Sequence, residues 1–226
     1  VKLATILGTF QSTLVNFKYV SGMWKKNCEE ERLLGVSLTG IMDNELTNGK
    51  SGDTGKLLDE LREEAVKTNK EYANKIGIPV AAAITCVKPS GTVSQLVDAA
   101  SGIHARHNPF YIRTVRGDKK DPLTKMMVDA GFPVEDDVMN PNHTSVFSFP
   151  MKVHKSAVFR TDMSAIEQLE LWLTYQKHWC EHKPSVTISV KEHEWLDVGA
   201  WVYANFDYMS GVSFLPFSDH SYKQAP

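Results

Sequence analysis

The chain has 226 residues, enough to bury one sizeable core, and it is 42% hydrophobic and 23% charged with a formal net charge of −2. This near-neutral balance excludes a general nucleic-acid or membrane-surface binder, because such proteins carry a basic excess. No apolar run reaches the roughly 20 residues that a membrane span needs. The cysteines Cys28, Cys86 and Cys180 are odd in number and far apart, which favours a reducing, cytoplasmic location over a disulfide scaffold.

Residues 3–17 carry apolar side chains at helical spacing, beginning with Leu3, Leu7 and Phe10. The pattern starts at once, with neither a Met nor a signal peptide before it. We therefore expect a helix here, in a chain that is a piece of something longer.

A strong helical pattern covers residues 53–76, and Gly77 stands where a C-cap belongs. Residues 80–87 are continuously apolar and are bounded by prolines, which predicts a strand buried on both faces, as in a parallel sheet. Residues 93–100 are expected to form the next helix.

Two further strands are predicted at residues 110–115 and 146–153, the second at a sheet edge or broken because of Pro150. The capping box Ser164-Ala-Ile-Glu167 opens a helix that Lys183-Pro184 ends. A strand at 185–190, a helix around 195–202 and a last strand at 212–215 follow. Strands that alternate with helices indicate an α/β fold with a partly parallel sheet. No linker divides the chain, so we expect a single domain over residues 1–226.

The best chemical signal is the loop Lys88-Pro-Ser-Gly-Thr-Val-Ser94, between the apolar strand and the next helix. Free N–H groups of a first helical turn, two hydroxyls and a glycine that allows close approach make an anion site. The predicted contacts are Pro89, Ser90, Gly91, Thr92 and Val93. An alternative stays open, in which Ser90 or Thr92 is only an N-cap.

Metal binding is the main rival. His178 and His182 lie four residues apart and would share a helix face, whereas Cys180 between them would point away. This is not a known zinc spacing, and a histidine near a helix C-terminus is favourable to the helix dipole by itself. We assign no metal ligand, and no nucleophile elbow is present.

Two residue classes have a simpler interpretation. Arg106, Arg113 and Arg116 are expected to be solvated on a half-exposed strand, and the five tryptophans are expected to be core and seam residues.

Four stretches, in order and over nearly the whole chain, resemble the large chains of ribonucleotide reductases. They read RLLGVSLTG at residues 32–40, KPSGTVS at 88–94 with GIH at 102–104, EHKPSVTI at 181–188, and GVSFLPF at 211–217, with QAP behind at 224–226. The last is most similar to the adenosylcobalamin-dependent (class II) members, especially monomeric triphosphate-reducing and phage-borne ones.

The resemblance implies a ten-stranded α/β barrel of two parallel five-stranded halves, of which this chain would be the C-terminal half. It also implies radical chemistry: a cobalamin-derived radical oxidises a cysteine to a thiyl, which abstracts the ribose 3′-hydrogen. A cysteine pair then supplies reducing equivalents, assisted by an Asn-Pro-Cys-x-Glu type motif. The implied partners are a ribonucleotide substrate, the missing N-terminal half and a thioredoxin-like reductant.

No cysteine of this chain has the neighbours of that motif, as Asn27-Cys28-Glu29 illustrates. We therefore assign no catalytic residue, expect the chain alone to be inactive, and carry over only the loop from Pro89 to Val93 as substrate-contacting. Lys183 departs from the asparagine of many relatives, which puts any hydrogen-bonding role there in doubt.

The last predicted strand bears on the radical source. Diiron-dependent relatives carry two adjacent tyrosines where this chain has Phe214 and Leu215, and neither side chain has an oxidisable O–H. This implies a radical made in place with adenosylcobalamin. Two other interpretations stay open: a phosphate-binding α/β domain without reductase activity, and a zinc hydrolase using His178 and His182.

Overall fold

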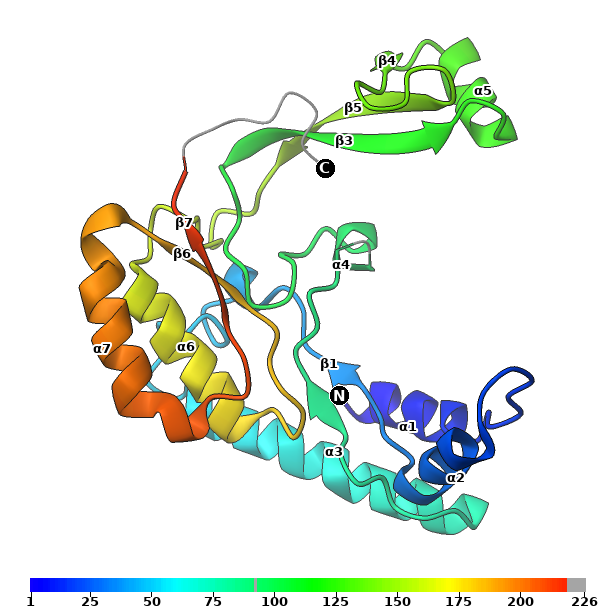
Figure 1. The fold of residues 1–226 in the computed structure, drawn as a ribbon, viewed down its shortest axis with the longest axis vertical. Coiled ribbons are helices and arrows are strands. Elements are labelled where there is room, and N and C mark those ends of the chain that lie inside the picture. The colour runs from blue at the N-terminus through cyan, green and yellow to red at the C-terminus, as the bar shows by residue number, and fades with distance from the viewer. Residues whose placement is uncertain (92, 219–226) are drawn as a thin grey trace. The chain divides into compact units, whose positions relative to one another are not determined.

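The computed structural model describes residues 1–91 and 93–218, so Thr92 and the tail at 224–226 lie outside it. The chain forms two compact units, one of residues 1–106 and 156–217, the other of residues 107–155 with Ser218 (Figure 1). The expected single domain over residues 1–226 stays a prediction. No helix among the described residues is long and apolar enough to cross a membrane.

Short parallel strands form the centre of the first unit. β1 (Val36–Ser37) pairs with β2 (Thr85–Cys86), and β6 (Thr187–Val190) pairs with β7 (Ser213–Pro216), both in parallel. A parallel bridge between Val87 and Pro184 joins the two sheets. Because β1, β2, β6 and β7 are each separated by helices, the predicted α/β fold with parallel pairing is confirmed.

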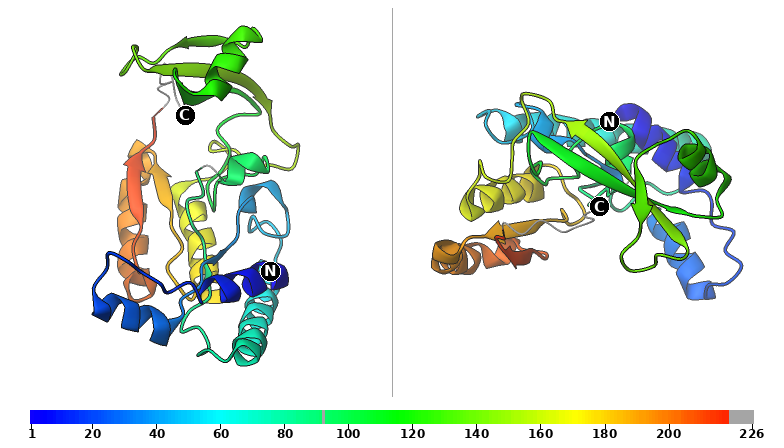
Figure 2. Two further views of the ribbon diagram at one scale, coloured as in Figure 1. Left: turned by 90° about the vertical axis from the view of Figure 1, so that its right-hand side faces the viewer. Right: turned by 90° about the horizontal axis from the view of Figure 1, so that it is seen from above.

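Three long helices pack beside these strands. They are α3 (Thr54–Ile76), α6 (Ala165–His178) and α7 (Trp195–Asn205). α6 contacts α3, α7 and β6, and Figure 2 shows it beside α7 behind the β6–β7 pair. Along β6, Ile188 and Val190 are buried whereas Thr187 and Ser189 are half-buried, as expected for one face against helices.

Shorter elements complete this unit. α1 (Lys2–Gln11) and α2 (Gly22–Glu31) precede β1, and the 3-10 turn η1 (Ile41–Asp43) follows it. α4 (Val93–Leu96) follows β2, and the 3-10 turns η2 (Glu192–Glu194) and η3 (Phe206–Tyr208) flank α7.

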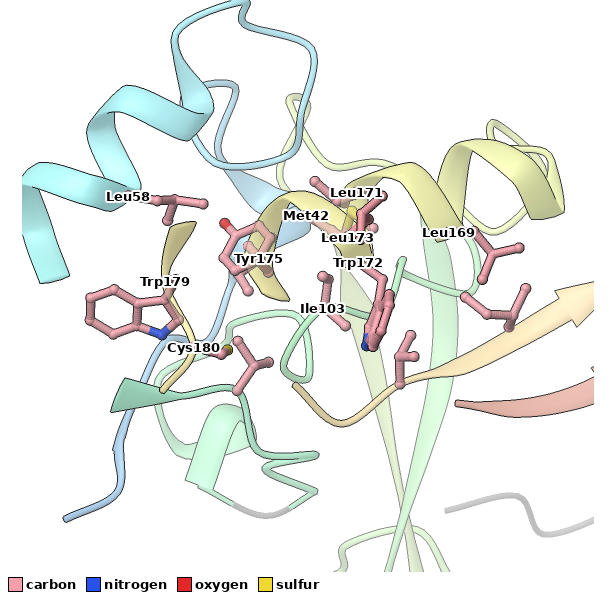
Figure 3. Close-up of a cluster of buried hydrophobic side chains, with 14 of the residues drawn as sticks. Met42, Leu58, Ile103, Leu169, Leu171, Trp172, Leu173, Tyr175, Trp179 and Cys180 are labelled. Atoms are coloured by element: carbon pink, nitrogen blue, oxygen red, sulfur yellow. The ribbon is translucent and has the colours of Figure 1, made fainter. Parts of the chain in front are cut away.

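The core lies around α6, where Trp172, Tyr175 and Trp179 are fully buried (Figure 3). Each buried polar atom of these rings donates to a carbonyl. Trp172 Nε1 donates to Pro184 O at 3.0 Å, Trp179 Nε1 to Cys86 O at 2.8 Å, and Tyr175 Oη to Thr47 O at 2.8 Å. The aromatic rings therefore fasten α6 to the strands and loops as well as filling space. The core prediction fails for Trp24 and Trp195, which are exposed.

The second unit is an antiparallel sheet in the order β3-β5-β4, with β3 at Phe110–Asp118, β4 at Val134–Asp136 and β5 at Thr144–Lys152. Helix α5 (Pro122–Asp129) lies between β3 and β4 in the sequence and is capped by Asp121, which accepts from Leu123 N–H.

Pro150 was expected at a sheet edge or a strand break, but β5 is unbroken and is the middle strand. β4 pairs only with residues 145–147 of β5, so at Pro150 the strand has a ladder partner on the β3 side alone, among the described residues. Proline is tolerated there because its missing N–H disrupts no second ladder.

Three other predicted bounds were wrong. The strand at 80–87 is reduced to Thr85–Cys86, because Ala81 N–H donates to the Asn69 side chain and Ala82 N–H to Glu31 O. The helix at 93–100 ends at Leu96, and α6 ends at His178, before Lys183-Pro184.

Helix α1 forms where the apolar spacing predicted a helix, but it ends at Gln11 rather than near residue 17, and its apolar stripe is not buried. Leu3 is 82% exposed and Leu7 is 69% exposed, whereas Thr5 and Thr9 are buried. Thr9 Oγ1 accepts from Asn69 Nδ2 of α3 at 3.0 Å, so α1 packs onto α3 through its polar side.

Candidate functional site

The predicted anion loop connects β2 to α4, so the expected order of strand, loop and helix start is present. The helix has a single turn, which leaves little macrodipole to attract an anion. An anion at this loop would therefore have to be bound mainly by the N–H groups of the loop itself. Of the predicted contacts, Thr92 lies outside the described residues.

Two carbonyl groups of the loop accept hydrogen bonds from nearby serine side chains. Ser94 Oγ donates to Ser90 O, and Ser101 Oγ donates to Pro89 O. Ser90 has a φ of +37°, an uncommon value for a residue other than glycine. We call residues 98–102, which run back past the loop after α4, the return segment.

The hydroxyl of Ser90 is also engaged. It lies 3.0 Å from Thr39 Oγ1 and accepts from Gly102 N–H at 3.2 Å. Because Thr39 Oγ1 donates to Ala100 O at 3.0 Å, the shared hydrogen between the two hydroxyls comes from Ser90. The hydrogen of this hydroxyl is therefore already engaged by Thr39, and among the described residues the hydroxyl accepts from no first-turn N–H of α4.

The N–H side of the loop is open. Within the described part of the chain, the N–H groups of Ser90, Gly91 and Val93 have no acceptor. A Cβ added at Gly91 would meet nothing within 4 Å, and Val93 is exposed. Unpaired N–H groups around an open glycine are what a phosphate needs.

The four segments of the predicted resemblance lie next to one another although they are far apart in the sequence. β1 belongs to residues 32–40, β2 leads into the loop, and β6 and β7 belong to 181–188 and 211–217. The bridge between Val87 and Pro184 completes the row. A hollow of about 470 Å³ beside the loop is lined by Cys86, Lys88, His182 and Lys183 among others.

His104 ties the return segment to β6. Its Nδ1 lies 3.1 Å from Ser101 O, and its Nε2 lies 3.1 Å from the N–H of Thr187. A backbone N–H can only donate, so Nε2 is the acceptor and Nδ1 carries the hydrogen. Burial is the main reason that the pKa of His104 lies below its usual value, so the ring is neutral.

No family model matches this chain. Among curated proteins, it is 26% identical to the adenosylcobalamin-dependent ribonucleoside-triphosphate reductase of Levilactobacillus brevis, over 89% of this chain and 31% of that protein. It is 29% identical to the Euglena gracilis protein of that name, over 96% of this chain and 31% of the relative. It is 33% identical to a probable such reductase of Dictyostelium discoideum, over 86% of this chain and 26% of the relative. This chain is homologous to a segment of these reductases.

The fold agrees with the sequence match. A crystal structure of a B-12 dependent (class II) ribonucleotide reductase matches with a TM-score of 0.83 and 23% identity, over 99% of this chain and 35% of the other. This chain therefore has the fold of about a third of that reductase chain, and it spans less than a third of the length of the curated reductases named above.

Two of the three cysteines are unsuited to thiolate chemistry in this chain. Cys86 and Cys180 are buried, and burial raises the pKa of both thiols. A thiol that stays protonated is a poor nucleophile. Cys28 is half-buried near the end of α2, 60 residues before Lys88 in the sequence.

The zinc alternative finds no support. His178 Nδ1 contacts Asp59 Oδ2 at 2.8 Å, whereas His182 lies beyond the helix end and its Nε2 contacts Leu34 O at 2.8 Å. Among the described residues, no three histidine, cysteine or acidic side chains are grouped as metal ligands would be.

Arg106 was expected to be solvated, and this was wrong. Its side chain is only 6% exposed and pairs with Asp43, 63 residues earlier. A lone basic residue in the sequence does not reveal so distant a partner.

Proposed function

We propose that this chain is part of an adenosylcobalamin-dependent reductase that converts ribonucleoside triphosphates to deoxyribonucleotides. The observation that supports this most is the alignment with such reductases along 86–96% of the chain. The adjacency of the four resembling segments supports it from the fold. In this proposal the chain contributes the C-terminal half of a ten-stranded barrel, and the parallel row of β1, β2, β6 and β7 belongs to that half.

Within the proposed enzyme, the loop from Pro89 to Val93 holds the substrate phosphates. The N–H groups of Ser90, Gly91 and Val93 would donate to phosphate oxygens, and Gly91 leaves room for the approach. Lys88 adds a positive charge at the start of the loop. Donation from several N–H groups to an anion orients the ribose without any change in the protonation of the protein.

The rest of the enzyme supplies the radical cysteine, the cysteine pair that receives electrons from a thioredoxin-like reductant, and the carboxylate. Such dithiol chemistry fits the reducing cytoplasm. The 226 residues contain no cysteine in the required motif, and burial keeps Cys86 and Cys180 protonated. The chain alone therefore binds and positions the substrate but performs no reduction.

Adenosylcobalamin would supply the radical that starts the reaction. The hollow of about 470 Å³ beside the loop is of the size that takes drug-sized ligands, which a corrinoid exceeds. This hollow is therefore not assigned to the cofactor, which belongs to the complete enzyme. On β7, Phe214 lies opposite Ile188 and Leu215 opposite Ser189, so this strand presents no pair of phenols for a long-range radical relay.

A chimera tests the proposal. This chain would replace the matching 31% of the Levilactobacillus brevis reductase, and deoxynucleotide formation would be measured with each of the four ribonucleoside triphosphates. Product that requires adenosylcobalamin and no iron protein supports the proposal. A chimera that has native-like circular dichroism but forms no product, or one that needs a diiron partner, contradicts it.

A further inference from the structure

A buried ion pair lies behind the phosphate loop. Arg106 donates from Nε to Asp43 Oδ1 and from Nη2 to Asp43 Oδ2, both at 2.9 Å, and the arginine side chain is 6% exposed. Such a two-point arrangement fixes both groups in orientation as well as in distance. Asp43 belongs to η1, whereas Arg106 forms a parallel bridge with Phe159, so the pair joins two separate parts of the first unit.

Both members of the pair also bind the return segment. Asp43 Oδ2 accepts from Ala100 N–H at 2.6 Å, and Arg106 Nη2 donates to Asp98 O at 2.7 Å. The backbone just after α4 is thus held by one negative and one positive group. Asp98 has a φ of +48°, so this hold acts on a turn that is unfavourable by itself.

Thr39 links the return segment to the loop by hydrogen bonds. It donates from Oγ1 to Ala100 O at 3.0 Å and lies at the same distance from Ser90 Oγ. Gly102 N–H adds a bond to that hydroxyl. The positive φ of Ser90, which sets the direction of the next N–H group, is therefore maintained by contacts from Thr39 and the return segment.

Helix α4 cannot do this by itself. It has one turn, and its apolar residues Val93 and Leu96 are exposed, so it has little packing to hold the loop in place. We propose that Arg106, Asp43 and Thr39 are positioning residues that preorganise the N–H groups of Ser90 and Gly91 for the triphosphate. This inference rests on the proposed function of the loop, and it assigns to these three residues a role in affinity without any contact to the ligand.

The test measures binding of inorganic tripolyphosphate to the full 226-residue chain by titration calorimetry, at a temperature where every variant is folded. Thr39→Val removes only the hydroxyl, and Arg106→Lys keeps the charge but loses the two-point pairing. Each should raise Kd about tenfold, the factor that corresponds to the loss of one good hydrogen bond. Thr39→Ser keeps the hydroxyl and should therefore bind with the wild-type Kd. A role of Thr39 in packing alone would not predict that result.

Amide hydrogen exchange provides the second measurement. Thr39→Val should speed exchange at Gly91 and Val93 but leave the centre of α3 unchanged. If a variant binds tripolyphosphate as tightly as the wild type and its amide hydrogens exchange equally slowly, the positioning role is wrong but the proposed function of the loop stands. A wild-type chain that does not bind tripolyphosphate overturns the proposed function, and the inference fails with it.

Discussion

Two glycines at the loop and its return segment are needed for opposite reasons. Gly102 has a φ of +52°, and a Cβ there would lie 2.5 Å from Lys88 O, so the fold itself demands glycine. Gly91 has free space around it and no positive φ, so the fold would accept a larger residue. A ligand that approaches the backbone, as proposed for this loop, would give Gly91 a reason to be small.

Gly91→Val should therefore leave stability within about 0.5 kcal/mol of the wild type, as is usual for an open surface site. It should nevertheless weaken tripolyphosphate binding about tenfold or more, because two methyl groups occupy the approach. Urea unfolding and calorimetry check the two halves of this prediction. Gly52→Val, at another glycine with nothing within 4 Å, is the matched control and should change neither quantity. Unchanged binding in Gly91→Val would make the loop a structural turn only.

His104 predicts a pH dependence of stability. Burial holds the folded pKa of His104 below the value in the unfolded chain, which is about 6.5. The unfolded protein therefore binds more protons at mildly acidic pH, so the stabilising effect is complete above about 6.5 and is lost as the pH falls below that value.

The measurement is urea unfolding at neutral and mildly acidic pH for the wild type and His104→Gln. The stability difference between the two proteins should be largest at neutral pH and shrink on acidification. His143→Gln, at an exposed histidine, should track the wild type at both values. A difference that stays constant with pH would contradict the neutral, buried imidazole.

The sequence predicted the loop itself, but not the residues that contact it. The residue types at positions 88–94 predict a turn with free N–H groups, because the pattern that indicates a turn lies in neighbouring residues. The engagement of Ser90 Oγ by Thr39 spans 51 residues, and the pairing of Arg106 with Asp43 spans 63. Neither partner is marked by a pattern, so only the fold reveals them.

At the scale of elements, local capping signals correctly located the start of α6 and the end of α3. α6 begins directly after Ser164, whose side chain accepts from Glu167 N–H while Glu167 Oε2 accepts from Ser164 N–H. α3 ends at Gly77, which adopts a φ of +80°. The strand at 80–87 failed, because an apolar run shows burial but not which backbone groups find a strand partner. Only Thr85 and Cys86 face β1, which has two residues.

Ser164→Ala should destabilise the first unit by about 0.5–2 kcal/mol, because it removes the N-cap of the helix around which the core is built. Glu167→Gln keeps an acceptor for the Ser164 N–H and should cost less. The midpoints of urea unfolding, with unchanged slopes, provide the comparison. Equal stability of Ser164→Ala and the wild type would show that packing alone defines the start of α6.

At the scale of the whole molecule, the apolar stripe of α1 stays largely exposed among the described residues, apart from an edge contact of the Phe10 ring with Tyr72. Leu3, Leu7 and Phe10 are exposed, whereas the polar residues Thr5 and Thr9 are buried against the rest of the unit. Exposed contiguous apolar side chains favour association. The reductase relatives are about three times as long as the matched segment, so in the proposed enzyme other parts of the chain are available to cover this stripe.

The isolated chain should accordingly self-associate, and Leu7→Glu should reduce this association without lowering stability. Sedimentation velocity over a range of concentrations measures the effect. Ala4→Glu, at an exposed residue of α1 off the stripe, adds the same single negative charge and is the control. A chain that is monomeric at all concentrations would show that the stripe is too small to drive association.

The second unit leaves the first at Arg106 and returns to it at Ser156. On the side of the first unit the two ends are tied together, since Arg106 N–H donates to Val158 O and Arg160 N–H donates to Arg106 O, both at 2.9 Å. Residues 107–155 therefore form an insertion whose two ends are held together by the first unit. The entropy cost of closing such a loop rises only with the logarithm of its length, so doubling the insertion would cost about 0.6 kcal/mol in closure entropy. A longer, shorter or rebuilt segment between Arg106 and Ser156 would therefore cost the first unit little in closure entropy.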